Sequence, residues 1–376
     1  MNILVAPNTF KNSLDARRVA LAIETGLKQS STGCNITRCP VGDGGDGTAD
    51  LLTEQLNGER IFIDVMGPLG KPVTAPIGFV ENGRVAIIEL ADASGLRLIS
   101  PAERNPLKAT TFGTGQLIAS AIQHGAKKIV MGIGGSATVD GGTGILRALG
   151  YTFYDAEENE LTEPASMIAL HHYHTPLVSL LDGVTIHLLC DVRNHLLGQN
   201  GAAAVFGPQK GATKEMVSVL EAALQRLRDV VWSTRGIDIG EVIHGGASGG
   251  VAAGLYGIAG AELLPGIEYF LSLTRFDQFL SSTDLVITGE GSLDEQSLEG
   301  KAPVGVAALA KKAGKKVVGM AGQITGRDKL QPYFDLLIDI NEGETDLAVA
   351  MQNTATNLTK AARKLGEDLA KSKLQL

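Results

Sequence analysis

The chain has 376 residues, a length that predicts two domains, or three, at about 150 residues per domain. Its net charge of −8 is opposite in sign to that expected of a protein that binds nucleic acid through phosphate contacts. Hydrophobic residues make up 44% of the chain, which is enough for a core and excludes general disorder. The 47 glycines exceed the average share of about 7% and occur in clusters between apolar runs. Such clusters are typical of loops that bring backbone close to a ligand.

The cysteine content and the apolar segments indicate the cellular location of the protein. Cys34, Cys39 and Cys190 are too few for a disulfide framework, and an odd number is typical of a reducing compartment. Residues 1–6 form a short apolar run that ends at a proline, without the features of a signal peptide. Residues 245–261 carry no charge but are rich in glycine and shorter than the ~20 residues of a membrane span, so we interpret them as a buried Gly-rich loop and helix. These features predict a cytoplasmic protein without a membrane partner.

The N-terminal residues alternate between strand and helix patterns. The apolar run at 2–6 predicts a buried strand, and a second strand is expected at 35–40. Helices are expected at 13–28, with Ser13 as N-cap, and at 48–56. This alternation is typical of a parallel sheet covered by helices.

The pattern changes after residue 60. Short β patterns at 61–66, 73–80 and 85–90 are joined by turn sequences and predict a meander. We therefore expect a different domain to begin near residue 61. The elements expected further along this domain are helices around 116–124, 145–149 and 214–232 and strands at 128–132, 151–154 and 184–190. The H-H-Y-H run at 171–174 lacks metal-ligand spacing and is interpreted as a polar loop.

The β/α alternation of the first domain resumes toward the C-terminus. Strands are expected at 284–288, 316–321 and 334–340, and helices at 303–313 and 345–370. Together with the two N-terminal strands they predict a doubly wound sheet of five parallel strands. The expected domains are therefore 1–60 with 271–376, interrupted by an inserted α/β domain at 61–270.

Candidate functional residues follow the expected strands, because ligands of open α/β sheets bind beyond the carboxyl ends of the strands. Five of these ends combine small flexible residues with carboxylates or lysines, and this is the strongest functional signal in the sequence. The candidates are Lys11 and Ser13 after the first strand, Asp43 and Asp46 in V-G-D-G-G-D-G-T, Glu290 and Asp294 in T-G-E-G-S-L-D-E-Q with Lys301 beyond, Ser136 in G-I-G-G-S-A-T-V-D-G-G, and Asp191 in C-D-V-R-N.

These residue types suit phosphoryl transfer. Nucleotide phosphates bind backbone N–H groups of Gly-rich turns together with a lysine. Mg²⁺ takes oxygen ligands from one or two carboxylates, and another carboxylate can accept the proton of the attacking hydroxyl. The chain has no G-x-x-x-x-G-K-[ST] P-loop and no H-R-D or D-F-G kinase motif, so a kinase would need a less common scaffold.

Two other classes of function remain open from these patterns. Gly132, Gly134 and Ala137 match G-x-G-x-x-A after a strand, and Asp155 follows the next strand, as in a nicotinamide-dependent hydroxy-acid dehydrogenase. The glycines that follow at residues 141–144 disfavour the helix that this fingerprint requires. A two-domain binding protein without chemistry is the second alternative, and the clustered acids and lysines argue against it.

Several motifs together resemble the bacterial glycerate kinase family. They are P-N-T-F-K-N-S-L, D-G-G-D-G-T, G-I-G-G-S-A-T-V-D-G-G, C-D-V-R-N, V-F-G-P-Q-K-G-A and L-V-I-T-G-E-G-S-L-D-E-Q-S-L-E-G-K-A-P, and the match covers essentially the whole chain. The resemblance implies ATP-dependent phosphorylation of D-glycerate with Mg²⁺, with 2-phosphoglycerate favoured over 3-phosphoglycerate. It also implies a flavodoxin-like α/β domain interrupted by a restriction-enzyme-like α/β domain with a mixed sheet. The oligomeric state is left open, with a homo-oligomer as one alternative.

With this resemblance, the candidate residues receive expected roles. The expected catalytic residues are Asp191, Lys11 and Asp43. Phosphate or substrate is expected at Ser13, Gly134, Gly135, Ser136, Thr138, Arg193, Glu290 and Lys301, and Mg²⁺ at Asp43, Asp46, Asp191 and Asp294. Asp46 stands where the family pattern has Glu, and it keeps the charge on a shorter side chain.

Overall fold

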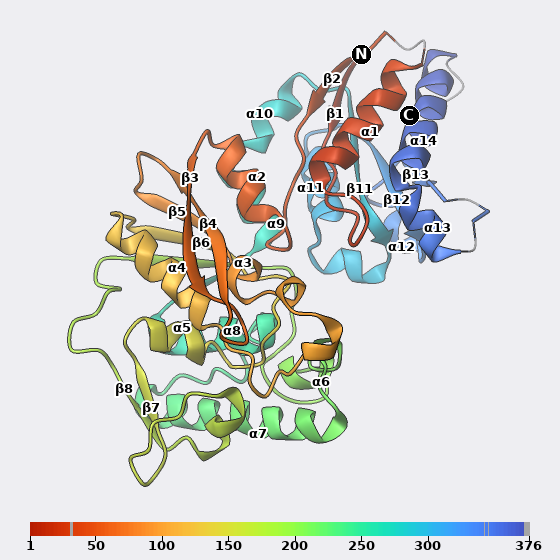
Figure 1. Ribbon diagram of the computed structural model, residues 1–376. Helices are drawn as coiled ribbons and strands as arrows, with labels where there is room; N and C mark the ends of the chain where they lie inside the picture. Colours follow the sequence, from red (N-terminus) through yellow and green to blue (C-terminus); the bar gives the residue numbers. More distant parts are fainter. Residues whose placement is uncertain (31–32, 342, 345, 372–376) are drawn as a thin grey trace. The chain divides into compact units, whose positions relative to one another are not determined.

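The structure is a computed structural model that describes residues 1–30, 33–341, 343–344 and 346–371. The chain forms two compact units, which we call unit 1 (Met1–Asp43 with Ile267–Leu376) and unit 2 (Gly44–Gly266). The N-terminal and C-terminal segments, red and blue in Figure 1, contribute strands to one sheet in unit 1. Within the described residues, no helix is both long enough and apolar enough to cross a membrane.

Unit 1 contains a five-stranded parallel sheet. Its strands are β1 (Asn2–Val5), β2 (Asn35–Arg38), β11 (Leu285–Leu293), β12 (Lys316–Ile324) and β13 (Leu336–Asp339). Their spatial order is β2-β1-β11-β12-β13, and every neighbouring pair is parallel. Numbered within the unit, this order is 2-1-3-4-5, the flavodoxin-like order. The expected fold class is confirmed for this unit.

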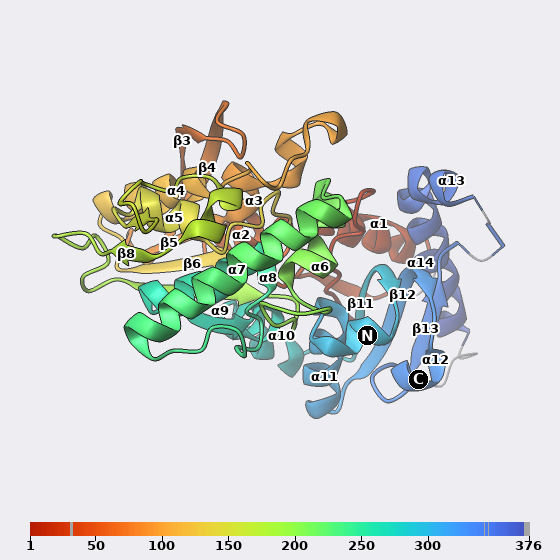
Figure 2. The ribbon, with the colours of Figure 1, turned by 90° about the horizontal axis from the view of Figure 1, so that it is seen from below.

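Helices cover both faces of this sheet (Figure 2). They are α1 (Ala16–Lys28), α9 (Gly266–Leu273), α10 (Phe276–Ser281), α11 (Ala302–Lys312), α12 (Arg327–Leu330), α13 (Leu347–Gln352) and α14 (Thr354–Ala370). Helices α1 and α14 pack together over one face, where Ile23 and Leu358 join a buried core with Ile3 and Ile287. A Cβ on Gly26 would lie 2.2 Å from the carbonyl oxygen of Thr359, so this close helix approach requires glycine. Helix α11 packs against β11 and β12.

Unit 2 contains a six-stranded mixed sheet of order β10-β9-β6-β5-β4-β3. Its strands are β3 (Glu59–Met66), β4 (Pro72–Val80), β5 (Val85–Glu89), β6 (Lys128–Gly132), β9 (Thr185–Cys190) and β10 (Glu262–Pro265). The β3-β4-β5 meander is antiparallel, as predicted, and β5, β6, β9 and β10 are parallel. This confirms the predicted inserted fold with a mixed sheet.

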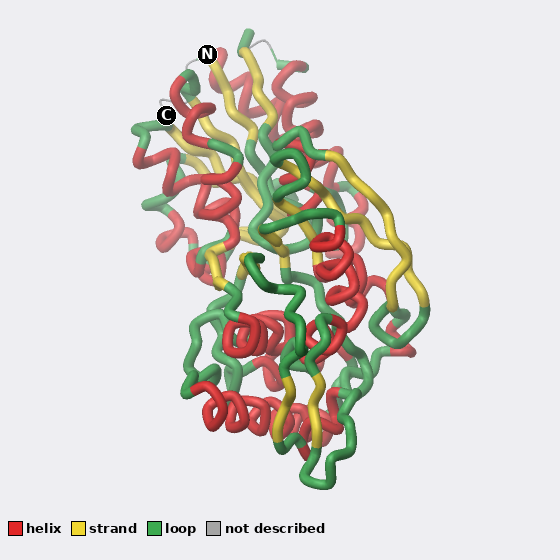
Figure 3. The backbone as a smooth tube through the Cα atoms, turned by 90° about the vertical axis from the view of Figure 1, so that its left-hand side faces the viewer, coloured by secondary structure: helices red, strands yellow, loops and turns green. Residues whose placement is uncertain are grey.

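The helices of unit 2 and a separate hairpin complete its core. The helices are α2 (Thr48–Gln55), α3 (Leu90–Ser94), α4 (Phe112–Gln123), α5 (Thr143–Ala148), α6 (Ala202–Phe206), α7 (Lys214–Arg235) and α8 (Ala247–Gly254). Strands β7 (Thr152–Tyr154) and β8 (His172–His174) form an antiparallel pair, visible as two separate yellow strands in Figure 3. Buried side chains of α4, α5, α7 and α8 pack with those of β5, β6 and β9 in one hydrophobic cluster.

The first boundary between the units lies earlier than predicted. Residues 44–60 belong to unit 2, whereas the sequence placed them in the first domain. Helix α2 explains the difference, because it packs against β3, β4, β5 and β6 and buries Leu51 and Leu52. The second boundary lies at Gly266, close to the expected residue 270.

Three local predictions were wrong. Helix α1 begins after Asp15, whose carboxylate accepts the backbone N–H of Arg18, so Asp15 rather than Ser13 is the N-cap. The H-H-Y-H run contains strand β8, in which Tyr173 is buried and pairs with Phe153, so it is not a loop. The single helix expected at 345–370 consists of α13 and α14, separated at Asn353, and residue 345 lies outside the described residues.

Candidate functional site

Three polar side chains lie near the carboxyl edge of the sheet in unit 1, on or beyond three adjacent strands. Asn8 lies just beyond β1, Asp43 lies beyond β2, and Glu290 lies in the second half of β11. Strand β1 lies between β2 and β11, and the Asn8 N–H donates to the carbonyl oxygen of Gly289 at 2.8 Å. In this strand order the chain reverses its winding between β1 and β11, the position at which such sheets bind ligands. We call these three residues the unit 1 cluster.

Asp43 is held by the side chain of Asn8 and by a helix N-terminus. Its Oδ2 accepts a hydrogen bond from Asn8 Nδ2 at 2.9 Å and a longer one from the Ala302 N–H at 3.4 Å. Asn8 Oδ1 accepts the Thr9 N–H at 2.7 Å, which fixes the orientation of the amide. Ala302 begins α11, and the partial positive charge of a helix N-terminus stabilises a carboxylate there. The structure therefore positions a buried negative charge at this edge.

Glu290 is the second buried carboxyl group of the cluster. Ser297 Oγ donates to its Oε1 at 2.9 Å, and only 8% of the residue is exposed. Burial raises the pKa of Glu290 to about 7; the negative charges of Asp43 and Asp294 act in the same direction, and Lys301 opposes them. A carboxyl group that titrates near neutral pH is typical of a functional site. The structure thus brings predicted residues Asp43, Glu290 and Lys301 into one electrostatic environment.

The other predicted residues of unit 1 have local structural roles or are exposed. Ser13 Oγ donates to the carbonyl oxygen of Met351 and lies 2.7 Å from Thr354 Oγ1, which connects the loop to the C-terminal helices. Asp294 caps the 3₁₀ helix η6 (Glu295–Glu299) by accepting the Ser297 N–H at 3.1 Å. Lys11 lies in an exposed turn. These contacts explain Ser13 and Asp294 without a ligand.

In unit 2, two Gly-rich loops pack backbone against backbone. The N–H of Gly134 donates to the carbonyl oxygen of Gly44 at 2.9 Å. A Cβ on Gly134 would lie 2.6 Å from the Cα of Gly45, and one on Gly135 would lie 2.5 Å from Oδ1 of Asp46. Glycine is therefore required here for the close approach of the two loops. The packing brings predicted residue Asp46 against the predicted phosphate loop, residues 134–138.

Ser136 and Thr138 are buried in this loop. Lys210 Nζ donates to Ser136 Oγ at 2.7 Å and to the carbonyl oxygen of Thr138 at 2.6 Å. Asp140, two residues further along, accepts hydrogen bonds from the N–H and hydroxyl of Thr111 at 2.8 and 2.7 Å and from the Gly142 N–H at 3.0 Å. Lys210 therefore holds the 134–138 loop, and Asp140 holds the residues that follow it.

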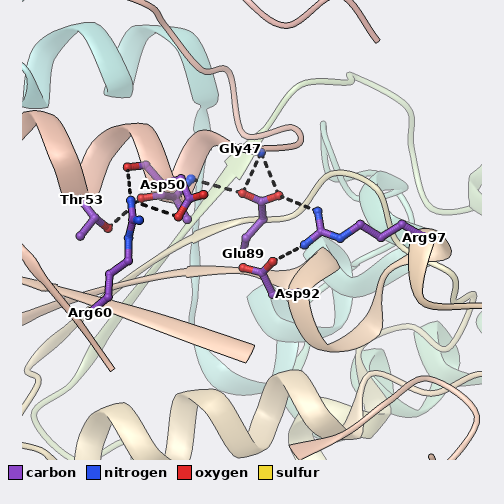
Figure 4. A network of polar contacts seen from close by, with 8 residues as sticks. Gly47, Asp50, Thr53, Arg60, Glu89, Asp92 and Arg97 are labelled. Carbon is purple, nitrogen blue, oxygen red and sulfur yellow. Dashed lines mark hydrogen bonds and ion pairs between the residues drawn. The ribbon is translucent and has the colours of Figure 1, made fainter. Parts of the chain in front are cut away.

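A buried carboxyl group fixes the loop that contains Asp46. Glu89, at the end of β5, accepts the Gly47 N–H with both oxygens at 2.9 Å, next to the start of α2 (Figure 4). Arg97 contacts Asp92 and lies 3.8 Å from Glu89. Burial raises the pKa of Glu89 to about 8 and that of Asp92 to about 6. The network therefore positions Asp46 through its neighbour Gly47.

Asp191 follows a strand that is the neighbour of β6, the strand that leads into the 134–138 loop. It follows β9, whose Leu189 pairs with Gly132 at the end of β6. The next residues are held by the segment 244–250, because the Gly246 N–H donates to Asn194 O at 2.8 Å. Arg193 is exposed. Asp191 and the 134–138 loop are thus neighbours at the carboxyl edge of the mixed sheet.

The carboxylates of the unit 1 cluster would suit a magnesium ion only if other ligands completed its coordination shell. Among the described residues, no group of three or more His, Cys, Asp or Glu side chains is arranged to hold a metal ion. Mg²⁺ in phosphoryl-transfer sites usually has only one or two carboxylate ligands and completes its shell with water and phosphate oxygens. Asp43 and Glu290 fit this smaller requirement, because Glu290 lies close enough to Asp43 for that negative charge to raise the pKa of Glu290.

The G-x-G-x-x-A match has a different explanation from the dinucleotide fingerprint. Residues 133–142 form no helix, and α5 begins only at Thr143. Gly134 is required by the packing against residues 44–45. Asp155 accepts the N–H groups of Glu157 and Asn159 within its own turn. The fingerprint requires a helix that begins directly at its glycines, and residues 133–142 form none.

Four functional candidates were missed in the sequence. Asn8 is the first polar residue after β1 and could have been found by the same strand-end rule as Asp43. Glu89 ends the apolar run V-A-I-I-E, where a charge at a strand end is a visible signal. Asp140 and Lys210 lie inside motifs that were recognised, but their partners are distant in sequence, and only the fold brings them together.

Comparison with known families gives one consistent result. The model of the "Glycerate kinase family" matches residues 3–370. A glycerate kinase from Bacillus subtilis (strain 168) is 40% identical, with 99% of each chain covered. A glycerate 2-kinase from Escherichia coli (strain K12) is 39% identical, with 98% of each chain covered. A crystal structure of a candidate glycerate kinase 2 from Salmonella typhimurium LT2 has a TM-score of 0.82 and 39% identity, with 100% of both chains covered.

Proposed function

The chain belongs to the glycerate kinase family and is a phosphotransferase, and we propose that it transfers the γ-phosphoryl group of ATP to the 2-hydroxyl group of D-glycerate. The products are ADP and 2-phosphoglycerate. The observation that carries this proposal is the unit 1 cluster, in which the buried carboxyl groups of Asp43 and Glu290 lie at the ligand-binding edge of the sheet. Transfer to the 2-position is supported by the Escherichia coli relative, which is named a glycerate 2-kinase.

The nucleotide phosphates are proposed to bind the 134–138 loop. Gly134 and Gly135 offer backbone close to the ligand, and Ser136 and Thr138 offer hydroxyl groups in the same loop. Lys11 is exposed and is the proposed cation for the transferring phosphoryl group. Backbone N–H groups and a lysine together stabilise the charge that develops on the phosphoryl oxygens.

The carboxylates are proposed to divide between the metal and the acceptor hydroxyl. Asp43 and Glu290 in unit 1 are the proposed contacts of Mg²⁺ and its water shell, and Asp46 in unit 2 is the alternative contact. When bound, Mg²⁺ neutralises charge on the phosphate oxygens. Asp191 is the proposed group that orients the glycerate hydroxyl and accepts its proton, with Asp43 as the alternative for this role. Either Arg193 or Lys301 is proposed to pair with the glycerate carboxylate.

The product of the purified protein tests this proposal. Incubation with ATP, Mg²⁺ and D-glycerate, followed by phosphorus NMR against authentic standards, should show the 2-phosphoglycerate resonance and ADP. L-Glycerate serves as the stereochemical control. A 3-phosphoglycerate product would contradict the proposed position of transfer, and absence of any phosphoglycerate would contradict the proposed substrate.

A further inference from the structure

Lys210 is a buried lysine that the proposed mechanism does not use. It ends the 3₁₀ turn η4 (Pro208–Lys210) inside the V-F-G-P-Q-K-G-A motif, and only 2% of it is exposed. Gly211 follows with a φ of +93°, and a Cβ there would lie 2.8 Å from Cβ of Arg104. Arg104 also donates to the Gln209 carbonyl oxygen at 3.1 Å. The turn is therefore held closely, which directs the Lys210 side chain inward.

The contacts of Lys210 are with neutral oxygens. Nζ donates to Ser136 Oγ and to the Thr138 carbonyl oxygen, as described above. An ammonium group has three N–H donors, so these contacts account for two of them. Asp140 is the nearby negative charge, but its carboxylate accepts hydrogen bonds from Thr111, Gly142 and Gly144. A buried cation with this environment is costly unless another anion approaches.

A second observation points to a ligand at the same loop. Thr138 Oγ1 is buried and has no hydrogen-bond partner within the described part of the chain. Buried hydroxyl groups normally have a partner, which is frequently a ligand or an ordered water in a functional site. The 134–138 loop therefore has the buried cation of Lys210 against Ser136 and an unsatisfied hydroxyl group at Thr138.

We propose that Lys210 is a positioning residue of the kinase that holds Ser136 toward a phosphoryl oxygen of ATP and supplies positive charge beneath the 134–138 loop. This inference rests on the proposed phosphate role of that loop. Lys210 acts through Ser136 and through its charge, and ATP binding is coupled to uptake of a proton by its neutral amine, which becomes an ammonium group.

The titration of Lys210 supports this coupling. Burial lowers the pKa of Lys210 to about 7, and the negative charge of Asp140 opposes that shift. Asp140 is the charged group facing it from the 134–138 side, and Arg104 lies against the turn from the other side. Burial therefore favours the neutral amine in the free protein. A bound phosphate favours the charged form and raises its pKa, so binding takes up a proton, and this contribution to affinity falls as the pH rises.

Lys210→Met tests the inference, because it keeps an apolar side chain of similar length and removes the charge. Titration calorimetry with ATP and Mg²⁺ near pH 7.5, in buffers of different ionisation enthalpy, measures affinity and proton uptake together. Loss of a charged hydrogen bond predicts about 10- to 100-fold weaker ATP binding, and the wild-type proton uptake should disappear. Lys214→Met, at the exposed start of α7, is the matched control and should bind ATP like the wild type.

Two further results decide between the inference and a purely structural role. Lys210→Met with wild-type affinity and wild-type proton uptake would overturn it, even if its melting temperature falls. If Lys210→Met does not fold, Ser136→Ala decides: weaker ATP binding with proton uptake retained supports the inference, and unchanged affinity overturns it. Wild-type protein that binds ATP without phosphorylating D-glycerate contradicts the proposed substrate and leaves this inference standing, whereas wild-type protein that does not bind ATP overturns both.

Discussion

Asp43→Asn separates the chemical role of the unit 1 cluster from its structural role. The substitution keeps the size of the side chain and removes its charge. The asparagine Oδ1 can still accept from Asn8 Nδ2, so the geometry at 2.9 Å can persist. What is lost is the charge that strengthens this hydrogen bond and interacts with the N-terminus of α11.

The structural cost can be bounded from these contacts. A hydrogen bond to a charged group contributes about 1.5–3 kcal/mol and a neutral one about 0.5–1.5, so the first loss is about 1–1.5 kcal/mol. The helix N-terminus adds about 0.3–1 kcal/mol. Removal of the repulsion between Asp43 and Glu290 acts in the opposite direction. The total, about 1–2 kcal/mol, leaves most molecules folded, because proteins are typically stable by about 5–15 kcal/mol.

Activity should fall much further than stability. If Asp43 contacts the metal or orients the acceptor hydroxyl, kcat for ADP formation should fall about 10²- to 10⁴-fold. A coupled ADP assay and thermal unfolding on the same samples measure both quantities. Asp155→Asn is the matched control: it loses the hydrogen bond from Asn159 Nδ2 to Oδ2 at 2.9 Å but should leave kcat unchanged. A variant of Asp43 that melts lower but keeps kcat within about threefold would refute the catalytic role.

Three further variants give distinct expectations. Asp191→Asn should lower kcat about 10²- to 10⁴-fold with a smaller change in the KM for D-glycerate. A variant with a lower melting temperature but normal turnover would rule out the catalytic role and leave only a role in capping the turn. In denaturant unfolding, Gly249→Ala should lower the free energy of unfolding by about 1–3 kcal/mol more than Gly236→Ala does. Both glycines have positive φ, but only at Gly249 would a Cβ meet a backbone atom, at 2.1 Å from the carbonyl oxygen of Thr138. Equal losses would contradict the packing argument. Glu89→Gln should flatten the dependence of melting temperature on pH. The pKa of Glu89 in the folded protein is about 8, above its unfolded value, so its contribution to stability falls as the pH rises from about 4.5 to 8. An unchanged slope would show that Glu89 does not titrate in this range.

The parallel sheet of unit 1 was predictable because its strands have short-range signals. Apolar runs such as Asn2–Val5 end at small or proline residues, and they alternate with amphipathic helices. The boundary near residue 60 was not predictable in the same way. Helix α2 has an ordinary helical pattern, and only its packing on β3, β4, β5 and β6 assigns it to unit 2.

The site residues that could be predicted from the sequence also differ in this way from those that could not. The strand-end rule found Asp43 and Glu290, because the topology of a parallel sheet brings strand ends to one edge. It also selected Ser13, whose hydroxyl contacts the distant C-terminal helices. Lys210 was missed for the converse reason: its partner Ser136 is 74 positions away, and no local pattern distinguishes a buried lysine from an exposed one.

Formation of ADP that depends on D-glycerate tests the central claim most directly. The purified protein is incubated with ATP and Mg²⁺, with and without D-glycerate, and ADP is measured by a coupled assay alongside a parallel incubation with NAD. We expect ADP to form in proportion to the D-glycerate consumed, little ADP without it, and no reduction of NAD. Hydride transfer without ADP, or ATP hydrolysis that is indifferent to D-glycerate, would contradict the account.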